Sequence, residues 1–464
     1  MDNKEHNHTK NLLEMAEDIK NRHVSVLNVV KELFEKIETV DKKLNSFITV
    51  NTNALETAKK MDEELAAGTI RGPLHGVPIG LKDIIETKGI KTTMGSDIYK
   101  DYIPEKNSTV VKKLEEAGAI IIGKLNTHQF AYGPTGDRSY FGPARNPYNT
   151  DKMTGGSSSG SGAAVSAGLC YGALGTDTGG SVRIPSAFCG IVGMKPTYGT
   201  ISKQGVYPLS WHLDHVGPMT RRIKDNAYLL NVLSGYDNQD LDAVPREQED
   251  FSRFIGEDVN DFSIGVPKQF YFEGLDKEIE KVMDSTIDKY RELGVNVKSV
   301  ELPDMETITK AHKVILRNDA FAVHEENLNN FPNAWDDELK ERLYTALEDK
   351  GHDYARAIRV RKLSKVIFNQ ALENVDAILT PTMSIMPPKI NGRYLNGEMN
   401  DNNHIRWTIT KLTSPTDLNG FPSLTMPCGF STDGMPIGAQ LIGKEFNEAK
   451  IYQLGYALEQ ALNL

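Results

Sequence analysis

The sequence predicts an α/β protein, built as one large α/β/α sandwich whose mixed central β-sheet is covered by helices on both faces. Strand-like and helix-like segments alternate along the chain, as in residues 108–125 and 277–302. Several short apolar segments have the length and composition of buried strands. No linker or internal repeat divides the 464 residues, so we expect one domain spanning residues 1–464.

Residues 1–67 are predicted to form an N-terminal helical segment on the outside of this domain. Apolar side chains recur there at helical spacing, first at Val26, Val29, Val30, Leu33, Phe34 and Ile37 and then at Ala54, Ala58, Met61 and Leu65. The catalytic region, residues 68–230, begins with a predicted strand in which Val77, Ile79 and Leu81 alternate with other residues. Lys82 stands at the end of that strand.

The remaining elements follow from caps, stops and apolar segments. Ser108 caps a predicted helix that Gly118 ends, and a strand follows at residues 119–122. A second helix ends at Gly294 and leads into an alternating segment. Further strands are predicted at 263–266, 377–380, 423–427 and 438–442, and a final helix at 447–462. Residues 302–374 are charged and helical, and we expect them to lie beside the sheet on the substrate side.

Composition excludes several classes of protein. The formal net charge of −10 argues against nucleic acid or an anionic membrane as a partner. The polar N-terminus does not resemble a secretory signal, and no segment reaches the length of a membrane span, so a cytoplasmic protein is expected. The three cysteines have no paired spacing and are predicted to be reduced core residues.

Residues 155–198 concentrate glycine and hydroxyl side chains within an apolar segment, GGSSSGSGAAVSAGLCYGALGTDTGGSVRIPSAFCGIVGMKPTY. A flexible linker would remain polar on both sides, whereas both Gly/Ser clusters here run into apolar residues. Glycine supplies backbone conformations that other residues avoid. The pattern therefore indicates an ordered, hydroxyl-lined turn, which suits a nucleophile with nearby backbone N–H groups.

Several other chemistries fit the sequence poorly. A phosphate-binding loop would need a lysine after its glycines, and no dinucleotide-binding GxGxxG stands at a clear turn. The single DTG at Asp177 lacks the second carboxylate of an aspartic protease. No GxSxG of a Ser-His-Asp hydrolase is present. The histidines show no metal-ligand spacing, so neither a metal nor a cofactor is expected.

A serine nucleophile activated by lysine remains. A buried lysine can be neutral, because desolvation lowers its pKa, and can then act as a base. Such a site needs a lysine from a strand, a relaying hydroxyl on a Gly-rich turn, and a second hydroxyl beside consecutive N–H groups. Lys82, Ser157 and Ser181 meet these three requirements.

The same residues carry a resemblance to the amidase signature family. The Gly/Ser cluster followed by DTGGSVRIP resembles the family's signature, GPLHGVPIGLKDII its lysine segment, and LDHVGPMTR its continuation. The resemblance covers residues 24–230 and resumes at 418–440. It implies hydrolysis of a small-molecule carboxylic amide through a serine acyl-enzyme.

Carried over, the resemblance implies a Ser-cisSer-Lys triad. Ser181 would be the acylated nucleophile, Ser157 the bridging serine after a cis peptide bond, and Lys82 the base. The backbone N–H groups of Thr178, Gly179, Gly180 and Ser181 would form the oxyanion hole.

Neighbouring residues receive supporting roles. Ser158 and Ser159 either hydrogen-bond around the lysine or serve the turn alone. Asp177 and Arg183 are predicted to form an ion pair that holds the turn. Four further residues are candidates for the substrate pocket, with a core role equally open for each: Phe130, Tyr132, Trp211 and His212.

Two branches of the family are considered. We expect a stand-alone amidase, because Ile409 and Thr410 stand where the A chain of tRNA-dependent amidotransferases would have an Asn-Asp pair. The arginine segment of that branch has no clear counterpart, although Arg356, Arg359 and Arg361 lie in the corresponding part of the chain. Missing charged partners would favour a neutral or apolar amide.

The alternative is the glutamine-hydrolysing component of such an amidotransferase, which would need partner subunits. A non-catalytic binding protein on the same scaffold is a remote third hypothesis. Whether the chain forms a homodimer is left open.

Overall fold

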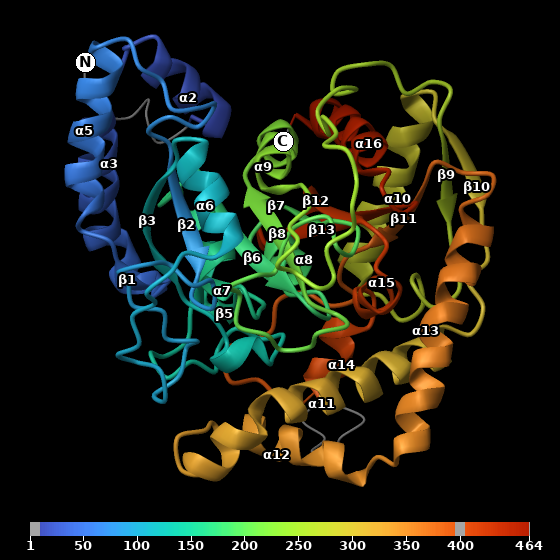
Figure 1. Ribbon diagram of the computed structural model, residues 1–464. Helices are drawn as coiled ribbons and strands as arrows, with labels where there is room; N and C mark the ends of the chain where they lie inside the picture. The colour runs from blue at the N-terminus through green and yellow to red at the C-terminus, as the bar shows by residue number, and fades with distance from the viewer. Residues whose placement is uncertain (1–9, 395–403, 464) are drawn as a thin grey trace.

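The computed structural model describes residues 10–394 and 404–463 and confirms the α/β architecture (Figure 1). Within these residues, one sheet of eleven strands runs through the molecule. In spatial order its strands are β1 (Phe47–Val50), β3 (Ile120–Leu125), β2 (Pro78–Lys82), β6 (Gly172–Asp177), β8 (His215–Thr220), β7 (Val192–Lys195), β12 (Ser423–Phe430), β13 (Pro436–Gly443), β11 (Ala377–Pro381), β9 (Ser263–Val266) and β10 (Asn296–Ser299).

The sheet is mixed, and its parallel part positions the candidate site. Strands β3, β2 and β6 are parallel, whereas β8, β7, β12 and β13 pair antiparallel with their neighbours. Because parallel strands end at the same edge of a sheet, Lys82 at the end of β2 and Asp177 at the end of β6 lie at one edge.

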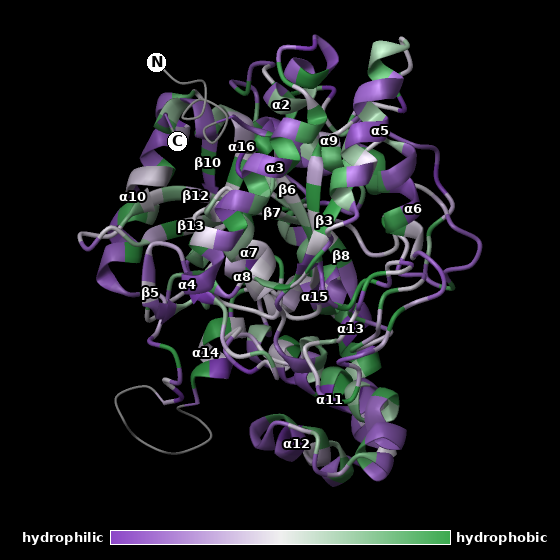
Figure 2. Cartoon of the chain, turned by 90° about the vertical axis from the view of Figure 1, so that its left-hand side faces the viewer, coloured by the Kyte–Doolittle hydropathy of each residue, from purple (hydrophilic) through white to green (hydrophobic). Residues whose placement is uncertain are grey.

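Helices cover both faces of the sheet. Helices α7 (Ser159–Ser166) and α8 (Arg183–Phe188) contact each other and pack on the central strands, while α9 (Ile223–Leu233), α10 (Lys277–Glu292) and α16 (Glu448–Leu462) form a second contiguous layer. Helix α6 (Thr109–Glu116) packs on β3 and α9. Figure 2 shows hydrophobic residues along the central strands and hydrophilic ones on outer helices such as α12.

The N-terminal segment differs from its prediction as purely helical. It contains the helices α2 (Leu12–Lys20), α3 (Val26–Lys36), α4 (Lys42–Leu44) and α5 (Ala54–Ala66), with a π-helical turn η1 (Ile37–Asp41). Between them β1 adds an edge strand, pairing antiparallel with β3. Residues 1–9 of this prediction lie outside the described residues.

Residues 302–374 are helical, as predicted, and extend along the lower edge and up the right-hand side in Figure 1. They form α11 (Met305–Asn330), α12 (Asp337–Tyr344), the 3-10 turn η3 (Thr345–Glu348) and α13 (Gly351–Ala371). The short helices α14 (Ile405–Thr410) and α15 (Ser414–Asn419), the 3-10 turn η2 (Gln129–Ala131) and the ribbon of β4 (Arg145–Asn146) and β5 (Asn149–Met153) complete the fold. None of the helices in the described ranges is long and apolar enough to cross a membrane.

Candidate active site

Lys82 is a buried lysine held by two hydroxyl groups. Its Nζ donates hydrogen bonds to Ser157 Oγ and Thr176 Oγ1, both at 2.7 Å. Burial lowers the pKa of Lys82 to about 7, against the charges of Asp214 and Asp177, which raise it. Lys82 can therefore exist as a neutral amine near neutral pH.

Ser157 follows a cis peptide bond from Gly156 and precedes α7. The backbone is crowded there, because a Cβ on Gly156 would lie 2.6 Å from the nitrogen of Gly136. The next residue, Ser158, exchanges two hydrogen bonds of 3.2 Å with the backbone of Thr176. Ser158 thus helps to fix the strand end that bears one of the two hydroxyl partners of Lys82.

Ser181 lies in the turn between β6 and α8, at the wall of a cavity. The N–H of Ser158 donates to the Ser181 carbonyl at 3.3 Å, which brings the two serine segments together. Gly180 has φ +121°, and a Cβ there would lie 2.2 Å from Thr413 Oγ1. Only glycine fits this step of the turn.

The carbonyl groups of the turn are held from outside it. His312 Nε2 donates to the Thr178 carbonyl at 2.8 Å, and Thr413 Oγ1 donates to the Gly179 carbonyl at 2.7 Å. Burial lowers the pKa of His312 to about 4, so this histidine is neutral. Of the four N–H groups predicted for the oxyanion hole, that of Gly180 donates instead to Asp177 Oδ1 at 2.6 Å.

Asp177 and Arg183 form a fully buried ion pair, with Nε and Oδ2 3.0 Å apart. Arg183 also donates to Asp417 Oδ2 and to Gln440 Oε1, each at 2.7 Å. Burial opposes ionisation of Asp177, but the charge and hydrogen bonds of Arg183 prevail and hold its pKa below the usual value. This network ties the turn to α15 and β13.

The cavity at Ser181 has a volume of about 200 Å³ and lies under the helices of residues 302–374. Apolar groups such as Leu209, Leu316 and Trp407 form part of its wall. Four cationic side chains and one carboxylate also line it: Lys313, Arg317, Arg342, Arg406 and Glu348. The expected lack of charged partners is therefore wrong. None of Arg356, Arg359 and Arg361 is among the residues that line it.

Of the four residues predicted for the pocket, Tyr132 lines this cavity. Phe130 instead packs among His324, Trp335 and Tyr207. His212 lies against the buried carboxylate of Asp319, 3.0 Å away. Phe130 is thus taken up by core contacts, and the half-exposed His212 by its contact with Asp319; neither lines the cavity.

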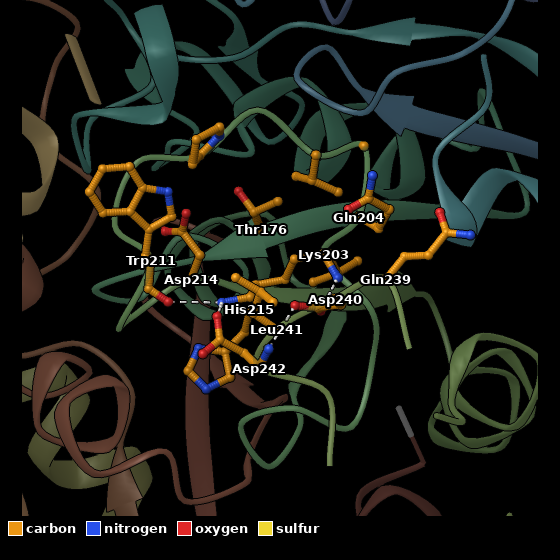
Figure 3. Close-up of a pocket in the computed structure, with 14 residues that line it drawn as sticks. Thr176, Lys203, Gln204, Trp211, Asp214, His215, Gln239, Asp240, Leu241 and Asp242 are labelled. Carbon is orange, nitrogen blue, oxygen red and sulfur yellow. Dashed lines mark hydrogen bonds and ion pairs between the residues drawn. The ribbon is translucent and has the colours of Figure 1, made fainter. Parts of the chain in front are cut away.

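Trp211 lines a second cavity, of about 280 Å³ (Figure 3). This cavity touches Thr176, the second hydroxyl partner of Lys82, and Asp214 (Figure 3). Among the described residues, no group of three or more His, Cys, Asp or Glu side chains is placed to hold a metal ion.

Thr176 is not among the predicted site residues. It stands in the GTDTGGS segment, one residue before Asp177, and this place in the motif is the signal that could have marked it. His312 and Thr413 give no local signal, because they reach the turn from distant helical segments.

Comparisons with known proteins agree over the length of the chain. A family model described as Amidase matches residues 28–452. The A chain of glutamyl-tRNA(Gln) amidotransferase from Geobacter sp. strain M21 is 38% identical, over 96% of each chain. A crystal structure of an amidase has a TM-score of 0.88 at 33% identity, covering 98% of this chain and 100% of that one. The corresponding amidotransferase chain of Thermotoga maritima has a TM-score of 0.83 at 31% identity, covering 98% and 95%.

Proposed function

Because the chain belongs to the amidase family, we propose that it hydrolyses a small amide through an acyl-enzyme on Ser181, with Ser157 as the relay and Lys82 as the base. The observation that carries this proposal is the 2.7 Å hydrogen bond between the buried Lys82 Nζ and Ser157 Oγ, beside the turn that bears Ser181.

The reaction begins with neutral Lys82. Its lone pair takes the proton of Ser157 as Ser157 takes that of Ser181, and Ser181 Oγ attacks the amide carbonyl. In the neutral amine the bond to Ser157 reverses, so that the Ser157 hydroxyl donates to the lone pair of Lys82 while Thr176 Oγ1 still accepts an N–H. Ser157 then protonates the departing nitrogen and takes a proton back from Lys82, which becomes neutral again, so that water can repeat the sequence on the acyl-enzyme.

The developing oxyanion needs N–H donors in the turn. We assign this role to Thr178, Gly179 and Ser181, all of which line the cavity, and not to Gly180, whose N–H is held by Asp177. Donors held in place before the reaction stabilise the transition state, by about 3 to 4 kcal/mol for one donor in other enzymes.

The rate is expected to rise with pH through about 7 and then level off. Only the neutral amine of Lys82 accepts a proton, and burial lowers its pKa to about 7. The measurement is kcat/KM between about pH 5 and pH 9. A rate that does not change over this range would exclude lysine as the base.

Lys195 provides the control for this assignment, because burial lowers its pKa to about 7 as well. It lies beside His215, 3.2 Å from Nε2, and not at the triad. The pH midpoint of kcat/KM should therefore be the same in Lys195→Met as in the wild type.

For the substrate we propose an amide that carries a carboxylate, with glutamine as the first candidate. Among the cationic side chains of the cavity, Arg317 is already paired with Asp349 and Arg342 with Glu338. With Lys313 and Arg406, however, the cavity keeps an excess of positive charge that suits a carboxylate, and Glu348 suits an ammonium group. Whole-length relatives named as the A chain of glutamyl-tRNA(Gln) amidotransferase point the same way. In that role the chain would act with partner subunits.

Ammonia release from three matched amides tests the substrate. Glutamine carries a carboxylate and an ammonium group, glutaric acid monoamide only the carboxylate, and butyramide neither. We expect the first two to be hydrolysed faster than butyramide. Glu348→Gln should raise KM for glutamine up to about fivefold and leave glutaric acid monoamide unchanged, because an exposed ion pair contributes up to about 1 kcal/mol. Glu341→Gln, on helix α12, is the control and should leave KM for glutamine unchanged.

A stand-alone amidase is the second candidate. Ile409 is buried with Ile184, Phe188 and Ile405, and Thr410 lines the cavity, so neither offers a charge for an amino acid. Faster hydrolysis of butyramide than of glutamine would favour this candidate. Glutamine hydrolysis that appears only with partner subunits and charged tRNA would favour the amidotransferase.

A further inference from the structure

The Asp214 side chain lines the second cavity (Figure 3) and bonds to Thr178, which lines the cavity of Ser181. It is partly buried in the loop that precedes β8 and accepts three hydrogen bonds. Thr178 Oγ1 donates to Oδ1 at 2.6 Å, and the backbone N–H groups of Leu209 and Ser210 donate to Oδ2 at 2.8 and 3.1 Å.

These bonds join the turn to the loop that separates the cavities. Leu209 lines the cavity of Ser181, whereas Pro208 and Trp211 line the second cavity. Thr178 contributes one of the N–H groups assigned to the oxyanion. Asp214 therefore bonds both to the residue that carries one of the assigned oxyanion donors and to the loop that lies between the two cavities.

We propose that Asp214 is a positioning residue for the proposed amide hydrolysis. By fixing the Thr178 backbone and the loop of residues 208–211, it keeps the oxyanion donors and Lys82 at the distance and orientation from Ser181 that the reaction needs. This inference rests on the proposed function. His312 and Thr413 hold the turn by its carbonyl groups, whereas Asp214 holds it by the hydroxyl of Thr178.

The pH midpoint of kcat/KM distinguishes this proposal from a merely structural role, because the charge of Asp214 acts on the pKa of Lys82. Lys82 faces the hydroxyls of Ser157 and Thr176 and the charges of Asp177 and Asp214, which both raise its pKa. Asp214 in turn lies near Lys203, whose Nζ pairs with Asp242 at 2.9 Å (Figure 3). Removing the Asp214 charge should thus move the pH midpoint of kcat/KM downward.

The test compares Asp214→Asn with Asp242→Asn by kcat, KM and pH profile. Asp242 lines the same cavity and its replacement makes the same charge change, but it does not bond to the turn. We expect Asp214→Asn to lower kcat about 10- to 100-fold with little change in KM, since small misplacements of catalytic groups have effects of this size. Its midpoint should fall, and Asp242→Asn should behave as wild type.

A second pair of variants keeps the proposal testable if Asp214→Asn does not fold. Thr178→Val removes the hydroxyl that Asp214 holds and should lower kcat, and Thr178→Ser restores the hydroxyl and should restore kcat. Where Asp214→Asn and Thr178→Val both fold, the variant that carries both substitutions should have a kcat no lower than that of the slower single variant.

Three results would overturn the inference: wild-type kcat and midpoint in folded Asp214→Asn, wild-type kcat in Thr178→Val, or losses that multiply in the double variant. Failure of the proposed function would be seen separately, as turnover that does not require Ser181.

Discussion

Replacement of Ser181 with alanine is expected to abolish amide hydrolysis while leaving the protein folded. The variant lacks the oxygen that attacks the carbonyl, and loss of a serine nucleophile costs on the order of 10⁶-fold in kcat in a comparable enzyme. The turn should persist, because it is held through its backbone by His312, Thr413 and Asp177. Ammonia release measures the loss of hydrolysis, and thermal unfolding shows whether the variant is folded.

Ser186→Ala is the matched control for Ser181→Ala. Ser186 is a buried serine in α8 whose Oγ donates to the Val182 carbonyl at 2.8 Å. It lies outside the cavity of Ser181, so turnover should stay near the wild-type value. Substantial turnover by Ser181→Ala would remove this serine from the proposed reaction.

Replacement of Lys82 with methionine is expected to lower kcat by about 10² to 10⁴-fold, the range for loss of a general base. Methionine fills the buried space without a group that accepts a proton. Lys82→Arg extends the test, because arginine keeps a positive charge and does not deprotonate in proteins. Both variants should show a loss of this size at every pH at which they are folded, as measured by ammonia release, with circular dichroism to establish that they are folded.

The arginine variant separates charge from proton transfer. If the cation of Lys82 only stabilised the site electrostatically, Lys82→Arg would keep substantial activity. That result would contradict the assignment of lysine as the base.

The sequence predicts best those elements whose apolar pattern is strong. The strand ending at Lys82, the strand beginning at Ile120 and the last helix lie within a few residues of their predicted positions. Strand β6 is not predicted, because GALGTD has weak β-propensity and its strand conformation depends on pairing with β2 and β8. Its Gly175 is required by packing, since a Cβ there would lie 2.7 Å from Ser158 Oγ.

The candidate triad can be predicted from the sequence because its residues stand in continuous motifs. The pocket cannot, because its cationic residues come from α11, α12 and α14, far along the chain from Ser181. Trp211 and His212 are near the signature in sequence, but the loop turns both away from the cavity of Ser181. Tertiary contacts of this kind leave no local pattern.

Mass spectrometry of enzyme quenched during turnover of a slowly hydrolysed substrate tests the central claim most directly. The account predicts an acyl group on the peptide that contains Ser181, absent from Ser181→Ala and present in Ser186→Ala. An acyl group on Ser157 or on any other residue, or product formation without an acylated enzyme, would contradict it.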